Sequence, residues 1–298
     1  MSLKKLKVEN FAEIKFLDIE KASQYEEIDF SVFVNLEELW ISSKTEFILP
    51  QNFTFLPKLK KLILDGNSRL PQNINELKTL KEVWLNDEGI YRVQESILKS
   101  DSIEILNIFY YPKLSEPKPA PEGIFQLKNL KKLRFSVCKF SEYNFENNQL
   151  DSLEELDFGC SLSDVKQFPD LSGLKNLKKL IVRGENVQGQ KVPRYELLAQ
   201  VLDSIKNLNQ LGELDLSFWR PKNKSERLVI KDHKTSIPDV FEHFTNLKKL
   251  SLIQMKLDCI PASILELKNL KELEFGENNL DQNEITRIKE RLPKCIVN

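Results

Sequence analysis

Hydrophobic residues recur along the chain in a short frame, with apolar residues at its first, fourth and sixth positions. Two segments show the frame in full: Leu59-x-x-Leu62-x-Leu64-x-x-Asn67 and Leu270-x-x-Leu273-x-Phe275-x-x-Asn278. Alternation of apolar and polar residues from the fourth position onward is typical of a short strand with one buried face. The frame starts again at nine other positions: Leu3, Leu36, Leu80, Ile103, Leu130, Leu153, Leu177, Leu211 and Leu247.

The distance between successive frames indicates a repeat protein. Most intervals are close to about 23 residues, which leaves room for a strand and a crossover connection in each repeat. Several connections contain proline with an apolar residue three positions later, as in the pairs Pro71 and Ile74, Pro238 and Phe241, and Pro261 and Ile264. This spacing favours a helical turn whose apolar residue packs inward. One repeat cannot bury its apolar residues alone, so the repeats are expected to stack.

The frame resembles that of the leucine-rich repeat superfamily, and in particular of short bacterial proteins with repeats of about 23 residues. The resemblance covers nearly the whole chain. It implies an α/β solenoid (a horseshoe) with a parallel concave sheet of about 11 strands and short helices or turns on the convex side.

The family usually has asparagine at the ninth position of the frame, where its side chain bonds to the backbone of the turn. Asn67 and Asn278 match this pattern, and Cys138 is a common substitute. The resemblance therefore implies that the other turns are irregular and are satisfied by other means. The remaining ninth positions depart from the pattern: Phe11, Lys44, Glu88, Tyr111, Ser161, Glu185, Trp219 and Met255.

The repeat count predicts a single leucine-rich repeat domain over residues 1–298. Residues 1–35 form an N-terminal cap and an irregular first repeat, in which 16–19 is a candidate extra strand. Residues 36–278 hold the other repeats. Residues 279–298 form a C-terminal cap, with a helix that ends at Pro293 and a final strand at 295–297.

Longer insertions interrupt the repeats near 109–129, 183–210 and 217–246. The first carries four prolines and is expected to be an extended loop. The second contains an amphipathic helix within 193–208, on the convex side. The third begins with a basic run from Arg220 to Arg227, which is either a solvated loop or a contact for an acidic partner.

Charges alternate along the third position of the frame. Neighbouring strands bring these residues within about 5 Å, so they are expected to form a ladder of opposite charges that fixes the strand register. The residues are Lys5, Glu38, Lys61, Glu82, Ile105, Lys132, Glu155, Lys179, Glu213, Lys249 and Glu272.

The fifth position carries the strongest candidate for a binding site. Trp40, Ile63 and Trp84 occupy successive repeats at positions expected to be exposed, and Phe109 and Tyr110, followed by Tyr111, extend the group. Apolar patches rich in tryptophan and tyrosine tend to mark binding sites. Alternatively, the N-terminal insertion or the proline-rich loop folds over the tryptophans. Further candidate contacts on the same face are Asn107, Arg134, Asp157, Arg183 and Asp215, near which the face becomes acidic.

Composition argues against several kinds of chemistry. The net charge is −1, no apolar run is long enough to span a bilayer, and glycine is scarce at 9 residues, so we expect no nucleic acid, membrane or cofactor binding. The four cysteines, Cys138, Cys160, Cys259 and Cys295, are far apart and are expected to be buried and reduced. With only His233 and His243 besides, no metal site is expected. Asp157 and Asp215 lie two repeats apart with Ile181 between them, which is poor geometry for acid–base catalysis.

The sequence therefore predicts a non-catalytic scaffold that binds a protein or peptide partner on its concave face. The charged N-terminus does not resemble a secretory signal, and we expect a cytoplasmic monomer. The alternative is a bacterial effector, immunity or regulatory protein that acts as the substrate-recognition part of an enzyme system. Some similar bacterial proteins carry a ubiquitin-ligase domain after the repeats, but here the repeats are expected to extend to the final cap.

Overall fold

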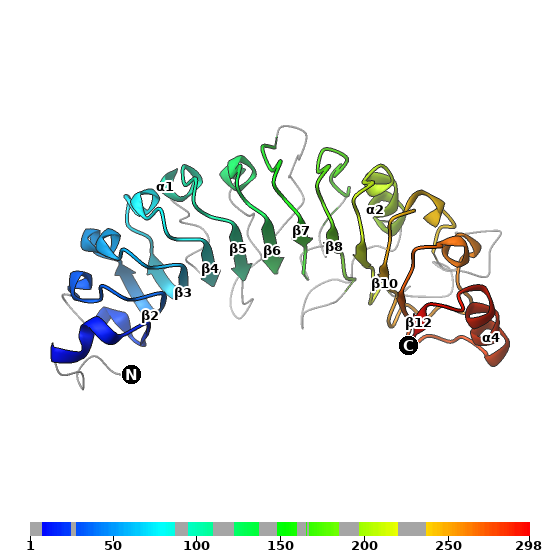
Figure 1. Ribbon diagram of the computed structural model, residues 1–298, viewed down its shortest axis with the longest axis horizontal. Coiled ribbons are helices and arrows are strands. Elements are labelled where there is room, and N and C mark those ends of the chain that lie inside the picture. Colours follow the sequence, from blue (N-terminus) through cyan, green and yellow to red (C-terminus); the bar gives the residue numbers. More distant parts are fainter. Residues whose placement is uncertain are drawn as a thin grey trace. The chain divides into compact units, whose positions relative to one another are not determined.

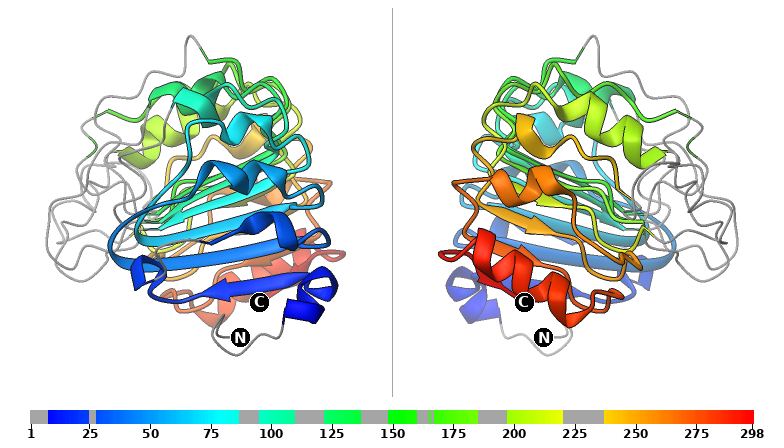
Figure 2. Two further views of the ribbon diagram at one scale, coloured as in Figure 1. Left: turned by 90° about the vertical axis from the view of Figure 1, so that its left-hand side faces the viewer. Right: turned by 90° about the vertical axis from the view of Figure 1, so that its right-hand side faces the viewer.

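The computed structural model describes residues 8–24, 28–86, 95–109, 122–136, 148–159, 165, 167–184, 197–219 and 237–298. The chain divides into two compact units, Met1–Cys138 with Gln149–Ser152, and Lys139–Asn148 with Leu153–Asn298. In each unit, short parallel strands form one layer, and short helices and turns lie on one side of it (Figures 1 and 2). The opposite side of each layer is called the open face below.

The first unit contains strands β1 to β6, each paired in parallel with the next in chain order. The strands are β1 (Phe16–Ile19), β2 (Glu38–Ile48), β3 (Lys61–Arg69), β4 (Glu82–Asn86), β5 (Ile105–Phe109) and β6 (Lys132–Ser136). The helices are η2 (Val8–Glu13), η3 (Ala22–Gln24), η4 (Phe30–Val32), η5 (Gln51–Phe55), η6 (Ile74–Glu76), α1 (Glu95–Leu98) and η8 (Glu122–Gln126).

The second unit contains strands β7 to β12, again paired in parallel. The strands are β7 (Glu155–Asp157), β8 (Lys179–Ile181), β9 (Glu213–Asp215), β10 (Lys249–Ser251), β11 (Glu272–Glu274) and β12 (Ile296–Val297). The helices are α2 (Leu197–Ile205), η9 (Phe241–His243), η10 (Ala262–Glu266) and α4 (Gln282–Arg291).

The repeat frame predicts the strands closely. Each of the strands β2 to β11 begins at the third position of a predicted frame, and β1 and β12 confirm the strands expected at 16–19 and at the C-terminal end. The frame at Leu3 lies outside the described residues. The leucine-rich repeat fold, with parallel strands and short helices or turns, is thus confirmed.

Burial follows the frame as well. The first, fourth and sixth residues of the repeat in β3, Leu59, Leu62 and Leu64, are almost completely buried. The residues that follow the connection prolines, such as Ile74 and Phe241, are buried in turns as predicted. Helix α2 confirms the amphipathic helix of the second insertion, since its apolar side chains are buried: Leu197, Leu198, Val201, Leu202 and Ile205.

Asparagines hold the turns at a position that the sequence analysis did not single out. In at least four repeats of the described chain, the residue just before the frame is an asparagine whose Nδ2 donates to a backbone carbonyl of the preceding repeat, at 2.7–2.8 Å. This bond satisfies a carbonyl that the turn leaves without a partner, and so ties each repeat to the one before. The asparagines are Asn35, Asn129, Asn246 and Asn269.

The ninth position behaves in three ways. Asn278 fulfils the expected role, since its Nδ2 donates to Leu252 O and its Oδ1 accepts from Met255 N. Trp219 replaces asparagine, because its buried indole Nε1 donates to Val182 O at 2.7 Å. Asn67, by contrast, lies inside the long strand β3 instead of at a turn.

The cysteine prediction is partly wrong. Cys259 and Cys295 form no disulfide, as expected, but both are partly exposed instead of buried, because they lie in the outermost C-terminal repeats. Burial raises the pKa of the Cys295 thiol. Cys138 and Cys160 lie outside the described residues, as do the proline-rich segment 110–121 and most of the basic insertion, 220–236. Among the described helices, none is long and apolar enough to cross a membrane.

Helix α4 closes the C-terminal end of the second unit. Asp281 caps the helix by accepting from Glu284 N, and Oε1 of Glu284 accepts from Ile260 N at 2.7 Å. Arg287 bonds both carboxylate oxygens of Glu284 and donates to Ile260 O. Burial acts to raise the pKa of Glu284, but the hydrogen bonds from Arg287 and Ile260 outweigh it, so this pKa is lowered.

We expect Glu284→Gln to lower the free energy of unfolding at pH 7 by about 1–2 kcal/mol, because it weakens charge-assisted hydrogen bonds. A carboxyl whose pKa is depressed in the folded state contributes its stability above the unfolded pKa and loses it as the pH falls through the folded pKa. The difference between wild type and variant should therefore shrink below pH 4.5, the ordinary pKa of the group. Urea unfolding of wild type and variant at pH 7 and pH 3 measures this difference in the free energy of unfolding. A difference that stays the same at both pH values would contradict the role given to Glu284.

Candidate partner-binding face

The fifth positions of the frame stand in register across the open face of the first unit. Trp40 in β2 pairs with Ile63 in β3, which pairs with Trp84 in β4. The same row continues to Asp18 in β1 and to Asn107 in β5. Five successive strands thus place these side chains side by side, about 4.8 Å apart from strand to strand.

Exposure separates the three apolar residues of this row. Trp40 is 41% exposed and Trp84 is half-buried, as expected for residues on an open face. Ile63, however, is only 7% exposed, which corrects the prediction that it is an exposed contact. The reason lies in the register: Ile63 has a tryptophan on each side, and the larger indoles shield it. Ile63 is therefore the floor of the site, with the tryptophans as its walls.

The charges of the third position fix the orientation of both indoles. Nε1 of Trp40 donates to Oε1 of Glu38 at 2.7 Å, and Nε1 of Trp84 donates to Oε1 of Glu82 at 2.5 Å. Nζ of Lys61 lies between the two carboxylates, 3.3 Å from Glu38 and 3.9 Å from Glu82, and 5.1 Å from the ring centroid of Trp84. The ladder, predicted as purely structural, thus also positions the tryptophans.

Other aromatic residues extend the row at both ends. The ring of Phe16 in β1 meets that of Trp40 edge-on at 5.9 Å, and Phe109 stacks on Trp84 at 5.6 Å. The guanidinium of Arg134 lies 5.0 Å from the ring centroid of Phe109. Phe16, which is 50% exposed, was not among the sequence candidates because β1 falls outside the aligned frames. Tyr110 lies outside the described residues.

A cavity of about 410 Å³ opens between the two tryptophans; we call it the tryptophan site. Three carboxylates lie along it: Asp18 and Glu20 from the first repeat, and Asp65, which is in β3 at the seventh position of its frame. The other lining residues are Trp40, Ile41, Ser42, Lys61, Ile63, Trp84 and Asn86. The site is therefore aromatic on its sides and acidic at its edge.

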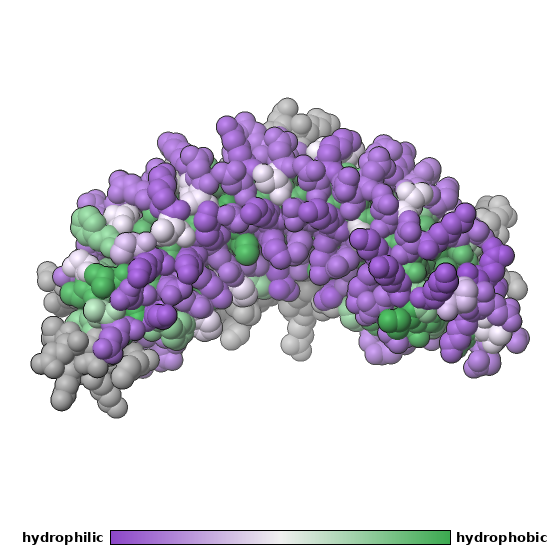
Figure 3. All heavy atoms as spheres, viewed as in Figure 1, coloured by the Kyte–Doolittle hydropathy of each residue, from purple (hydrophilic) through white to green (hydrophobic). Residues whose placement is uncertain are grey.

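The charge ladder is confirmed within each unit. Besides the Lys61 pairs, Lys179 pairs with Glu213 and Lys249 with Glu272, each at 3.0 Å. A second ladder runs along the preceding frame position, which the sequence analysis missed. Its pairs are Lys60 with Glu37, Lys81 and Lys131 with Glu104, and Lys178 with Glu154. Hydrogen bonds from Lys131 and Lys81 lower the pKa of Glu104. In the view of Figure 3 most of the surface is hydrophilic, and hydrophobic residues gather over the N-terminal repeats of the first unit and over the C-terminal repeats of the second.

In the second unit, Asp157, Ile181 and Asp215 stand in register, as predicted. Both carboxylates accept from the backbone two residues ahead: Asp157 from Gly159 N at 2.7 Å and Asp215 from Ser217 N at 3.0 Å. This arrangement is a local turn contact. It engages both aspartates in holding the ends of their strands.

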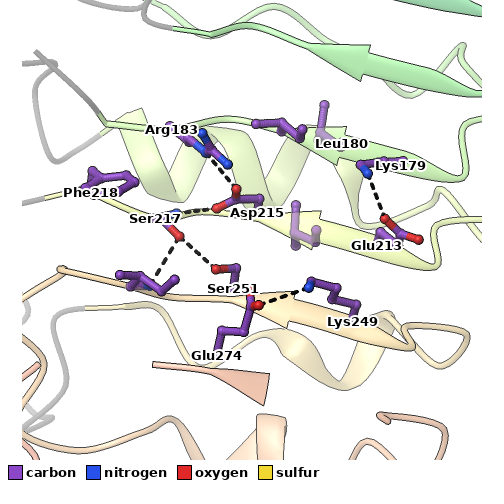
Figure 4. A pocket seen from close by; sticks show the side chains of 13 residues that line it. Lys179, Leu180, Arg183, Glu213, Asp215, Ser217, Phe218, Lys249, Ser251 and Glu274 are labelled. Carbon is purple, nitrogen blue, oxygen red and sulfur yellow. Dashed lines mark hydrogen bonds and ion pairs between the residues drawn. The ribbon is translucent and has the colours of Figure 1, made fainter. Parts of the chain in front are cut away.

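A second cavity, of about 430 Å³, lies on β8 to β11 (Figure 4). Nε of Arg183 donates to Oδ2 of Asp215 at 2.7 Å, and the buried hydroxyls of Ser217 and Ser251 lie 2.9 Å apart. Lys249 pairs with Glu274 at 3.0 Å, a contact that, with the one to Glu272, raises the pKa of the lysine. The polar groups of this cavity satisfy one another, so the cavity is pre-organised for polar contacts and is less apolar than the tryptophan site.

The structure thus divides the candidate residues between the two units. The first unit holds Trp40, Ile63, Trp84, Asn107, Phe109 and Arg134, and the second holds Asp157, Arg183 and Asp215. In the part of the chain that the structure describes, no group of three His, Cys, Asp or Glu side chains could hold a metal ion.

The frame, the parallel strands and the connecting turns together define the class of this chain: it is a leucine-rich repeat protein. No protein-family model matches it. It is 28% identical over 235 residues, 78% of its length, to the human volume-regulated anion channel subunit LRRC8B. It is also 26% identical over 248 residues, 83% of its length, to the rat subunit LRRC8A. These matches span only 24% and 27% of the two relatives.

Among solved structures, the chain is similar to an internalin (inlF) from Listeria monocytogenes. The TM-score is 0.52 at 15% sequence identity, over 98% of this chain and 82% of the internalin. At this identity, the likeness supports the fold, while the functional residues have to be argued from the chain itself.

Proposed function

We propose that this chain is a non-catalytic recognition scaffold that binds a protein or peptide partner through the open face of its first unit. Trp40, Trp84 and Phe109 are the main contacts, with Arg134 beside them. The observation that carries the proposal is the pair of oriented tryptophans, one of them 41% exposed, on a face whose neighbouring positions are charged. Residues 1–298 act in this role as one leucine-rich repeat domain.

The physical reason lies in what a partner gains at this site. Tryptophan offers a large contact area with few rotatable bonds, and it is enriched among the residues that contribute most to binding. Here Glu38 and Glu82 already hold both indoles, so that less side-chain freedom is lost when a partner covers them. The surrounding charged ladders form the polar rim that such interfaces usually have.

The second unit contributes polar recognition. Arg183 and Asp215 form a part-buried pair at its cavity, and the ladder residues Lys179 and Lys249 line the same cavity. Charged groups held in fixed positions contribute more to the choice of a partner than to the strength of its binding.

We expect Trp40→Ala combined with Trp84→Ala to abolish partner capture while the protein stays folded. The measurement is affinity capture from the native cells, read by quantitative mass spectrometry. The matched control is Phe55→Ala, an aromatic residue in η5 that is 67% exposed and lies in a connection instead of at a fifth position. The control should capture the same partner as wild type.

Two results would contradict the proposal. One is unchanged capture by the tryptophan double variant. The other is a loss of several kcal/mol in its free energy of unfolding, which would show that the tryptophans are covered core residues.

A further inference from the structure

We propose that the tryptophan site binds a cationic side chain, arginine or lysine, carried by an extended segment of the partner. This inference rests on the proposed function and specifies the chemistry of the partner at that site. It follows from three features of the described residues. They are the aromatic walls, the carboxylates at the edge, and the ion pairs by which Lys61, the only lysine in the lining, already contacts Glu38 and Glu82.

The walls suit a cation because of the electronic structure of indole. The face of tryptophan carries negative charge and attracts an ammonium or guanidinium group more strongly than tyrosine or phenylalanine does. The described part of the first unit already contains such cation–π contacts, Lys61 over Trp84 and Arg134 over Phe109. Trp40 is the wall that remains substantially exposed.

The edge of the site supplies negative charge. Asp18, Glu20 and Asp65 line the cavity, and within the described part of the chain none of the three makes an ion pair. Opposite charges across an interface steer association and reject partners of the wrong sign. Three carboxylates at one cavity therefore favour a basic segment and repel an acidic one.

Lys61 does not cancel this charge. Its ammonium lies between Glu38 and Glu82, so that these three residues together carry one net negative charge. In addition, Oδ1 of Asn86, another lining residue, is buried and accepts no hydrogen bond from the residues that the structure describes. An unsatisfied buried acceptor is costly, and arginine brings five N–H donors to a site.

The form of the site also fits a side chain from an extended segment. The cavity is bounded by neighbouring parallel strands: its tryptophan walls stand on β2 and β4, two strand spacings (about 9.6 Å) apart, with Ile63 of β3 between them. A long arginine or lysine stem can pack its methylene groups on Ile63 and the indoles while its charged end reaches the carboxylates.

The test uses two synthetic probes of nearly the same size and shape, acetyl-(Gly-Arg)3-amide and its citrulline counterpart, in which a neutral urea group replaces each guanidinium. Binding to the full chain is followed by tryptophan fluorescence at low salt. We expect the arginine peptide to bind at least about tenfold more tightly than the citrulline peptide, as one cation–π contact with an ion pair supplies. We expect Asp18→Asn combined with Asp65→Asn to remove about tenfold of that affinity.

The control for net charge is Glu242→Gln combined with Glu290→Gln, which neutralises two carboxylates of the second unit and should leave the affinity unchanged. Three results would overturn the inference: no binding of the arginine peptide, equal binding of both peptides, or the same loss in the control and the aspartate variant. If the aspartate variant still captures the partner that the tryptophan variant loses, this inference fails while the proposed function stands.

Discussion

Replacing Leu62 by alanine is expected to lower the free energy of unfolding by about 2–5 kcal/mol. Leu62 is the fourth residue of its frame, lies near the start of β3 and is completely buried. It stands in register between Leu39 in β2 and Val83 in β4, which are equally buried. The truncation leaves a cavity that the stacked strands on both sides cannot close, since each is held by its own ladder of backbone hydrogen bonds.

Urea denaturation followed by circular dichroism measures this loss. Phe55→Ala provides the comparison, because an exposed aromatic residue in the same unit should cost no more than about 0.5 kcal/mol. An equal effect of the two substitutions would show that the frame does not direct its fourth position into the core.

Replacing Trp219 by alanine is expected to cost about 3–5 kcal/mol, since a completely buried aromatic side chain is removed. The substitution also removes the hydrogen bond that the indole Nε1 of Trp219 donates to Val182 O at 2.7 Å. Gly184 packs against the backbone of Trp219 so closely that a Cβ on this glycine would lie 2.7 Å from the Trp219 Cα. The side chain therefore joins the end of β9 to the end of β8.

A second variant separates the hydrogen bond from the packing. Trp219→Phe keeps most of the ring but leaves Val182 O without its donor, which should cost about 1–3 kcal/mol. Trp40→Phe is the matched control, because the half-exposed indole of Trp40 bonds a carboxylate that can also reach water. If Trp219→Phe is as stable as wild type, the bond to Val182 does not replace the asparagine of other repeats.

Most of the fold could be predicted from the sequence because the repeat frame reports burial directly. Leucine at the first, fourth and sixth positions fixes where each strand begins, and the strands β2 to β11 follow from this alone. The final helix and strand were also predictable, since Pro293 ends the apolar spacing of α4.

The turns were harder to predict because several residue types can satisfy the same backbone group. Asparagine was expected at the ninth position of the frame, whereas Asn35, Asn129, Asn246 and Asn269 act one residue before the frame. A count of asparagines at that position would have found them. Trp219 could not be found in this way, because an indole rarely takes this role.

The candidate site was predictable in part. Trp40 and Trp84 follow from the fifth position, and their exposure agrees with it. Ile63 was placed wrongly because the frame gives the direction of a side chain but not the size of its neighbours. Asp18, Glu20 and Phe16 were missed because β1 lies outside the aligned frames. Only the register of β1 with β2 brings Asp18 and Glu20 to the site and Phe16 against Trp40.

Site-specific photo-crosslinking tests the central claim, that a partner binds the open face of the first unit, most directly. Benzoylphenylalanine is placed at Ser42, which lines the tryptophan site, or at Phe55, which is exposed in the connection η5. We predict that irradiation in the native cells links a partner to the protein modified at Ser42 and not to the one modified at Phe55. The adduct should disappear in the Trp40→Ala and Trp84→Ala background. Adducts at Phe55 alone, or adducts at Ser42 that persist without the tryptophans, would contradict the proposed role of this face.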